Sequence, residues 1–168
     1  DNRAALMIAP ETGFPTGGSL MMKGEIPAGW HTGKHVHGEE AIYVVQGEGF
    51  LALDDCRYNF RKGTIFHIPY RSVHQLFNTG SEPVTYISGL AWPLEASIYM
   101  GKIEQIEDAG EHSAQALSQF PAEASQYWPT DGRRISMHEE QFVLSGETKH
   151  GATYFMMGRS GKDNGFKA

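Results

Sequence analysis

Cysteine is almost absent from the 168-residue chain, because Cys56 is the only one. An internal disulfide is therefore excluded, and we expect a cytoplasmic protein in a reducing compartment. Long hydrophobic runs are also missing. None approaches the roughly 18–20 apolar residues that a membrane-spanning helix needs, so we expect no association with a membrane.

Positive charge is scarce as well. The sequence has 14 lysines and arginines against 20 aspartates and glutamates, which gives a formal net charge of −6. A chain with this balance is a poor binder of the phosphate backbone, so we do not expect a nucleic-acid partner. Its hydrophobic content of 40% is ordinary for a globular protein, and its length is sufficient for one sizeable core.

Turn-forming residues are abundant. The 20 glycines and 8 prolines separate short β-branched and aromatic runs, which are typical of strands. Strands are predicted at residues 19–26, 40–46, 49–53, 56–60, 64–68, 73–78 and 83–91. We expect 40–46 and 49–53 to pair as a hairpin across Gly47 and Glu48. The pattern predicts an all-β fold, a sandwich or jelly roll whose two sheets pack over one core.

Two histidines separated by one residue, His35 and His37, precede the strand predicted at 40–46. Alternate residues of an extended chain point to the same side, so both imidazoles can aim at one transition-metal ion. Glu39 and Glu40 follow at once, and either carboxylate is a candidate third ligand. A further histidine, His74, follows a proline turn and lies in another predicted strand.

The first of these stretches resembles the first sequence motif of the cupins, G-x5-H-x-H-x(3,4)-E-x6-G. Gly29, His35 and His37 fit its beginning, and the spacing from Glu40 to Gly47 fits its end. One departure is that only two residues separate His37 from Glu40, one fewer than the usual minimum.

The second stretch resembles the second cupin motif, G-x5-P-x-G-x2-H-x3-N. Gly63, Pro69, His74 and Asn78 lie at the matching positions, and Arg71 stands where the motif has glycine. The resemblance covers residues 18–95. Two motifs in the right order are far more specific than a single pair of histidines.

The resemblance implies a cupin jelly-roll barrel over residues 18–100 with His35, His37, Glu40 and His74 as metal ligands. The spacing to Gly47 favours Glu40 over Glu39. In the alternative, both glutamates are solvated and the site has three histidine ligands only.

Three further residues are candidates for supporting roles, although a structural role is the simpler interpretation of each. His31 lies four residues before His35, in the loop that leads to the metal strand. His67 shares a strand pattern with Ile65 and Pro69 that predicts a place in the barrel, where it would support a ligand. Arg71 lies in a turn at the barrel mouth, where a guanidinium suits a carboxylate.

Imidazole and carboxylate ligands suit Fe(II), Mn, Ni, Cu or Zn, and two histidines with one carboxylate and open positions favour Fe(II) with O₂. The resemblance therefore implies a metal-dependent cupin oxygenase, an Fe(II) dioxygenase that acts on a small phenolic or aromatic-acid substrate. One alternative is a cupin isomerase, lyase or decarboxylase that uses Mn or Zn. The other is a non-enzymatic module that binds a small molecule.

Residues 1–17 are predicted to form an N-terminal arm. Residues 101–168 are predicted to form an extension of short helices or extended segments that packs on the barrel, or that leads to a second cupin. Within it, residues 138–146 echo residues 37–47, either as a degenerate repeat or as an edge strand or helix. Because bare sheet edges are a liability, we expect the arm or the extension to cover an edge, within the chain or across a homodimer or larger cupin assembly.

Overall fold

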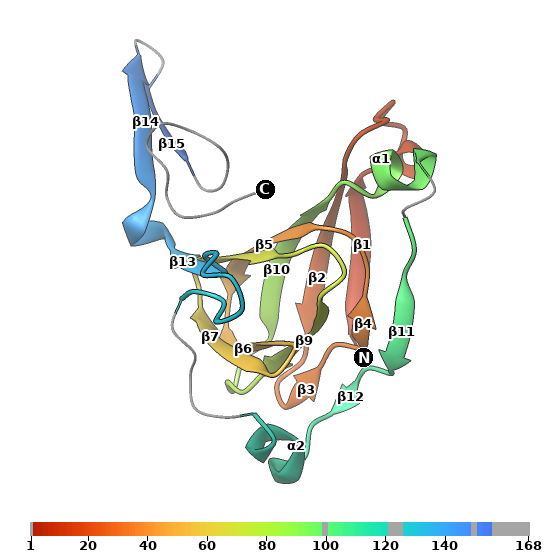
Figure 1. The fold of residues 1–168 in the computed structure, drawn as a ribbon, viewed down its shortest axis with the longest axis vertical. Helices are drawn as coiled ribbons and strands as arrows, with labels where there is room; N and C mark the ends of the chain where they lie inside the picture. The colour runs from red at the N-terminus through yellow and green to blue at the C-terminus, as the bar shows by residue number, and fades with distance from the viewer. Residues whose placement is uncertain (1, 99–100, 121–125, 149–150, 156–168) are drawn as a thin grey trace.

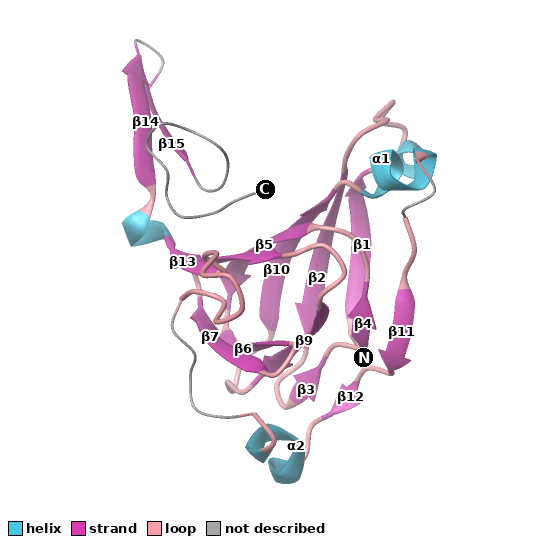
Figure 2. Cartoon of the chain, viewed as in Figure 1, coloured by secondary structure: helices cyan, strands magenta, loops and turns pink. Residues whose placement is uncertain are grey.

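Two antiparallel sheets form a barrel in the computed structural model, which describes residues 2–98, 101–120, 126–148 and 151–155 (Figures 1 and 2). The six-stranded sheet has the order β1 (Arg3–Ile8), β2 (Leu20–Ile26), β10 (Val84–Leu90), β5 (Glu40–Gln46), β8 (Thr64–Ile68) and β13 (Ser136–His138). The seven-stranded sheet has the order β11 (Glu104–Glu107), β4 (Lys34–Val36), β9 (Val73–Asn78), β3 (Trp30–His31) and β12 (Gly110–Glu111). Its other two strands are β6 (Glu48–Leu53), which pairs with β9, and β7 (Cys56–Arg61), which pairs with β6.

The remaining elements are short. They are η1 (Pro10–Thr12), α1 (Trp92–Ser97), α2 (Ala114–Ser118), η2 (Glu139–Gln141), β14 (Val143–Thr148) and β15 (Gly151–Phe155). The strands β14 and β15 pair with each other as a separate two-stranded sheet. Neither α-helix of the described chain has the length or apolar character that crossing a bilayer requires.

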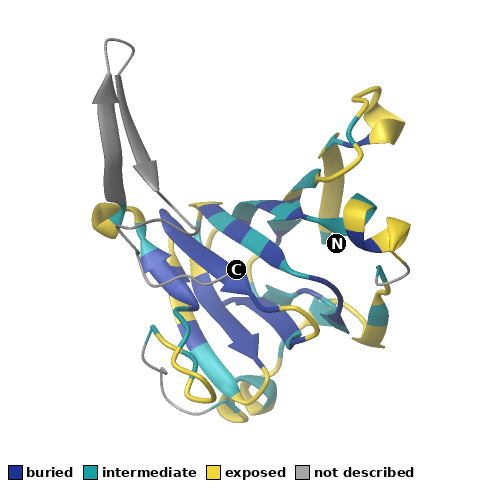
Figure 3. Cartoon of the chain, turned by 45° about the horizontal axis from the view of Figure 1, so that its top comes forward, coloured by how far each residue is buried: buried dark blue, intermediate teal, exposed yellow. Residues whose placement is uncertain are grey.

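Side chains that alternate along the strands build one core between the two sheets. On β5 and β8 the inward positions are held by Ile42, Val44, Phe66 and Ile68, all nearly or fully buried. They pack against Leu51 and its neighbours from the facing sheet. Figure 3 shows this concentration of buried residues in the barrel strands, whereas the short helices are mostly exposed. The predicted all-β jelly roll is confirmed.

The predicted hairpin between residues 40–46 and 49–53 is wrong. Both edges of β5 are occupied, by β8 and by β10, while β6 pairs with β7 and β9 in the other sheet. The chain crosses between the sheets at Gly47, whose φ is +89°. A Cβ there would lie 2.8 Å from Cα of Val84, so the crossing needs glycine for both its conformation and its space.

The two segments outside the cupin motifs add strands to the barrel, as Figure 1 shows. The N-terminal β1 covers the edge of β2, and from the C-terminal extension β11 covers β4 and β13 covers β8. The expectation that one of these segments covers a sheet edge within the chain is therefore confirmed. Of the echo at residues 138–146, only His138 belongs to the edge strand β13. Residues 139–141 form η2, and residues 143–146 lie in β14, which pairs with β15 outside the two barrel sheets.

Candidate metal centre

Three histidines converge at one end of the barrel. His35 lies on β4 and faces His74 directly across the antiparallel pair β4–β9, and His37 follows the end of β4. Their ring centroids are 4.4 Å (His35–His74), 4.6 Å (His37–His74) and 5.1 Å (His35–His37) apart. One nitrogen from each ring lies within 4.8 Å of the other two, close enough for one metal ion to bind all three.

Backbone carbonyls fix which nitrogen of each ring faces this centre. Nδ1 of His35 donates to the Gly33 oxygen at 2.8 Å. Nδ1 of His37 donates to the Gly38 oxygen at 2.9 Å, and Nδ1 of His74 donates to the Ser72 oxygen at 3.0 Å. A carbonyl only accepts, so each neutral ring carries its proton on Nδ1. The Nε2 lone pairs are therefore available to a metal, in the orientation that hydrogen-bonded metal ligands adopt.

The Glu40 carboxylate lies beside the histidines. Glu40 opens β5 and its side chain points inward, where it is 5% exposed. Its Oε2 lies 3.4 Å from Nε2 of His37 and 3.5 Å from Nε2 of His74. The shortened spacer between His37 and Glu40 therefore still brings this carboxylate to the centre.

Burial and charge act on these groups together. Burial, with the charge of His74, lowers the pKa of His35 to about 4, so this ring is neutral near neutral pH. Burial acts to raise the pKa of Glu40, but His37 and His74 lower it overall. Burial also acts to lower the pKa of His37, but the Glu40 carboxylate raises it overall. The centre therefore holds a buried negative charge that requires a cation beside it.

The Nε2 atom of His74 supports a fit between these residues and a metal ion. Nε2 of His74 is buried and has no hydrogen-bond partner among the described residues, although the Glu40 carboxylate is nearby. An unsatisfied buried polar atom is costly. A metal ion bound by the three imidazoles would satisfy this nitrogen, and its charge would balance Glu40.

A cavity of about 230 Å³ opens over the histidines. Its polar lining consists of the three histidines, Glu40, Tyr86 and Gln105. The rest of the wall is apolar and comes from several strands and from the residue before β11: Ala4, Met22, Ile42, Leu76, Leu90 and Ile103. Convergent polar groups on one side of an apolar cavity are typical of a small-molecule site.

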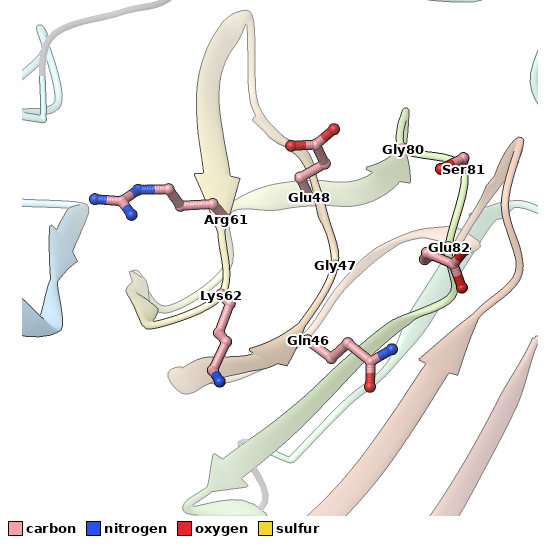
Figure 4. A pocket seen from close by; sticks show the side chains of 8 residues that line it. All are labelled: Gln46, Gly47, Glu48, Arg61, Lys62, Gly80, Ser81 and Glu82. Atoms are coloured by element: carbon pink, nitrogen blue, oxygen red, sulfur yellow. The ribbon is translucent and has the colours of Figure 1, made fainter.

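A second hollow lies where β5 passes into β6, and Figure 4 shows its lining. Its volume is about 340 Å³, larger than that of the histidine cavity. Its charged and polar side chains do not converge, since Arg61 and Gln46 point away from each other (Figure 4). The arrangement of polar groups, and not the volume, makes the histidine cavity the candidate site.

The His67 side chain does not point into the interior of the barrel, so its expected place near the metal is wrong. On β8 its neighbours Phe66 and Ile68 point into the core, so His67 points to the outer face of the sheet. There its Nε2 lies 2.5 Å from Oε1 of Glu39, and this contact lowers the pKa of the Glu39 carboxyl. Glu39 is therefore directed to the outside of the barrel.

His31 and Arg71 also lie apart from the cavity lining. His31 is on β3, with Nδ1 2.9 Å from Nε2 of Gln75 and its ring tilted against Phe77. Arg71 has a φ of +63°, which explains why the cupin motif has glycine at this position. Its guanidinium donates to Oε1 of Glu104 on β11 at 3.0 Å.

Sequence reasoning missed Gln105 and did not single out Tyr86 among the aromatic residues. Gln105 comes from the extension and reaches the cavity because β11 pairs with β4, which places it opposite His35. Tyr86 is one of many aromatic residues in a strand pattern. The informative feature is its pairing with Gly24 on β2, which only the strand register reveals.

Comparison with known proteins agrees with the fold. A family model described as "Cupin domain" matches residues 20–89. An uncharacterized protein of Methanocaldococcus jannaschii is 33% identical over 61 residues, which are 35% of this chain and 49% of that protein. The matched segment therefore spans about half the length of this curated relative.

Solved structures with the same fold have diverse names. A salicylate 1,2-dioxygenase from Pseudoaminobacter salicylatoxidans with gentisate aligns with a TM-score of 0.60 at 21% identity, over 79% of this chain and 37% of that one. A cupin-like protein from Thermotoga maritima aligns with a TM-score of 0.57 at 18% identity, over 73% and 86%. The coconut allergen cocosin aligns with a TM-score of 0.52 at 18% identity, over 61% and 32%.

At these identities the solved structures establish the fold, and function has to be argued from the site. The family match includes the three histidines and Glu40. Residues 20–89 therefore form a cupin domain, in a barrel that has the cupin fold.

Proposed function

We propose that the protein is an Fe(II)-dependent dioxygenase that acts on a small phenolic or aromatic-acid substrate. The observation that carries the proposal is the convergence of three imidazoles and the Glu40 carboxylate at the base of an apolar cavity. Two histidines and a carboxylate with open positions are typical of non-haem Fe(II) oxygenases.

His35, His37 and His74 would hold the iron through Nε2, with Glu40 beside them as the anionic ligand. Bound there, Fe(II) would supply the electron transfer that O₂ requires and the open positions for substrate oxygens. The carbonyls of Gly33 and Ser72 keep the rings of His35 and His74 oriented.

The apolar wall has its own part in the reaction. The side chains of Met22, Ile42, Leu76 and Leu90 give a flat substrate ring an apolar surface to pack on. They also exclude water from the space around the histidines, which strengthens electrostatic interactions in the site and suppresses side reactions.

The comparisons support an oxygenase without deciding the substrate. The salicylate 1,2-dioxygenase structures include complexes with gentisate, an aromatic acid. This chain covers only about a third of their length, so their reaction is a precedent for the fold and not an assignment.

The test is oxygen uptake by the iron-loaded protein against a panel of phenols, hydroquinones and phenolic acids. We expect O₂ consumption in a fixed ratio to product, with both oxygen atoms incorporated from ¹⁸O₂, and loss of uptake in the His74→Ala variant. Turnover with Mn²⁺ or Zn²⁺ in the absence of O₂ would contradict the proposal and favour an isomerase, lyase or decarboxylase. Ligand binding without turnover in any metal form would favour a binding module.

A further inference from the structure

Tyr86 occupies a special position on the cavity wall. It lies on β10, opposite Gly24 of β2 and Val44 of β5, and its side chain points inward. A Cβ at Gly24 would lie 2.1 Å from Cζ and 2.4 Å from the hydroxyl oxygen of Tyr86. The phenol therefore extends across β2 in space that exists only because residue 24 has no side chain.

The Tyr86 side chain lines the cavity, and its hydroxyl makes no hydrogen bond to any residue that the structure describes. Burial, with a smaller effect from the charge of Glu40, raises the pKa of Tyr86 well above its usual range. The group therefore remains a protonated hydroxyl. A half-buried hydroxyl on a cavity wall, with its donor not used within the described protein, favours a ligand that presents an oxygen to it.

The charges around the cavity limit the ligand further. Glu40 already places a negative charge at its base. Among the described residues that line the cavity, none is a lysine or an arginine. Arg71 has its guanidinium on Glu104, and Lys102 contacts the same carboxylate at 2.9 Å. A second anionic group, away from the metal, would meet an apolar wall and lack a counter-ion.

The cavity is also small. Its volume of about 230 Å³ is below the roughly 300–1,000 Å³ that is typical of sites for drug-sized ligands. A single substituted aromatic ring is a suitable occupant, because the wall offers apolar side chains on several sides.

We propose that the cavity takes a small aromatic ligand that is uncharged apart from the oxygens it directs toward the metal centre of the three histidines. Tyr86 orients this ligand by a hydrogen bond to one of its oxygens. This inference rests on the proposed function and narrows its substrate class, because it selects phenols with a neutral ring substituent over phenolic acids. Tyr86 is a specificity-determining residue in this account, placed by Gly24.

The test uses two probes that differ only in charge, 3,4-dihydroxybenzamide and 3,4-dihydroxybenzoate. Both present the same pair of oxygens to a metal. Zn²⁺-loaded protein keeps binding separate from turnover, and isothermal titration calorimetry gives the dissociation constants. We expect the amide to bind at least about tenfold more tightly, because the distal carboxylate would be buried without a partner. Equal or tighter binding of the benzoate would overturn the inference.

Two variants test Tyr86 in different ways. Tyr86→Phe keeps the ring and removes the hydroxyl, and we expect roughly threefold to tenfold weaker binding of the amide, the range for one hydrogen bond. Gly24→Ala keeps the hydroxyl and displaces the ring, so it should weaken binding as well. Both variants should retain the Zn²⁺ content of the unchanged protein.

Tyr43→Phe is the matched control. Tyr43 lies on the neighbouring strand β5 but points outward, where its hydroxyl donates to Oε2 of Glu139 at 2.6 Å. This variant should bind the amide like the unchanged protein. If Tyr86→Phe binds the amide as tightly as Tyr43→Phe does, Tyr86 does not orient the ligand.

The same experiments separate the inference from the proposed function. Tighter binding of the amide, dependent on Tyr86, supports the inference even if the iron form never consumes O₂. Oxygen uptake that is fastest with phenolic acids would support the dioxygenase and overturn the inference. A chain that binds no Zn²⁺ and no Fe(II) contradicts both.

Discussion

Glu39 and Glu40 are adjacent in the sequence, yet their carboxylates lie on opposite faces of one sheet. Oε2 of Glu40 is 3.4 Å from Nε2 of His37 inside the barrel, whereas Oε1 of Glu39 is 2.5 Å from Nε2 of His67 outside it. The alternation of an extended chain produces this separation. It assigns Glu40 to the candidate metal centre and gives Glu39 a structural partner.

This relationship predicts different results for two equivalent substitutions. Glu40→Gln removes the negative charge beside the three imidazoles and should lower metal affinity at least about tenfold. Glu39→Gln should leave metal affinity unchanged and lower the melting temperature, because it weakens the contact with His67. Metal affinity measured by competition with a chelating dye distinguishes the two. A loss of metal in Glu39→Gln alone would reverse the assignment.

Metal binding should also stabilise the fold. The ligands come from β4, the chain after it, β5 and β9, so an ion links both sheets. A metal at 100 times its dissociation constant stabilises a protein by about 2.7 kcal/mol. We expect a clear rise in the melting temperature when Fe(II) or Zn²⁺ is added, reversed by a chelator and absent in His74→Ala. An equal rise in His74→Ala would place the metal elsewhere.

Arg71 should lower stability through its backbone conformation. Its φ of +63° is unfavourable for any residue with a Cβ. Arg71→Gly and Arg71→Ala both remove the contact with Glu104, but only glycine relieves the strain. We expect the glycine variant to be more stable to urea than the alanine variant by about 1 kcal/mol. Equal stability of the two variants would show that this turn is not strained.

The crossing between the sheets predicts a large effect at Gly47. Gly47→Ala combines an unfavourable φ with a close contact to the backbone of Val84, and should cost roughly 2–4 kcal/mol of unfolding free energy. Gly89→Ala is the control, because a Cβ at Gly89 would meet no atom within 4 Å. Chemical denaturation of both variants tests the prediction. Similar unfolding free energies for the two would contradict it.

The sequence predicted the strands of the barrel well, because their residue types and turn signals are local. It also predicted which histidines converge, since their spacing matches a known pair of motifs. It failed at Gly47, where a turn signal between two strands was taken for a hairpin. A glycine with positive φ serves a tight turn and a crossing between sheets equally well, and only the pairing of β5 with its two neighbours decides between them.

His67 and Tyr86 show the other limit. The face on which a strand residue lies depends on register, and a change of one position reverses it. The strand pattern of His67 was compatible with the barrel interior, yet its neighbours Phe66 and Ile68 occupy the inward positions. The importance of Tyr86 depends on its register with Gly24, far away in the sequence.

We infer that His35, His37, His74 and Glu40 together bind one transition-metal ion. The most direct test is the metal content of the purified, metal-loaded protein, measured by mass spectrometry beside the His35→Ala/His74→Ala double variant. We predict one transition-metal ion per chain in the unchanged protein and almost none in the double variant, with the circular dichroism spectrum of a folded β-barrel in both. A double variant that retains one metal ion per chain would contradict the account.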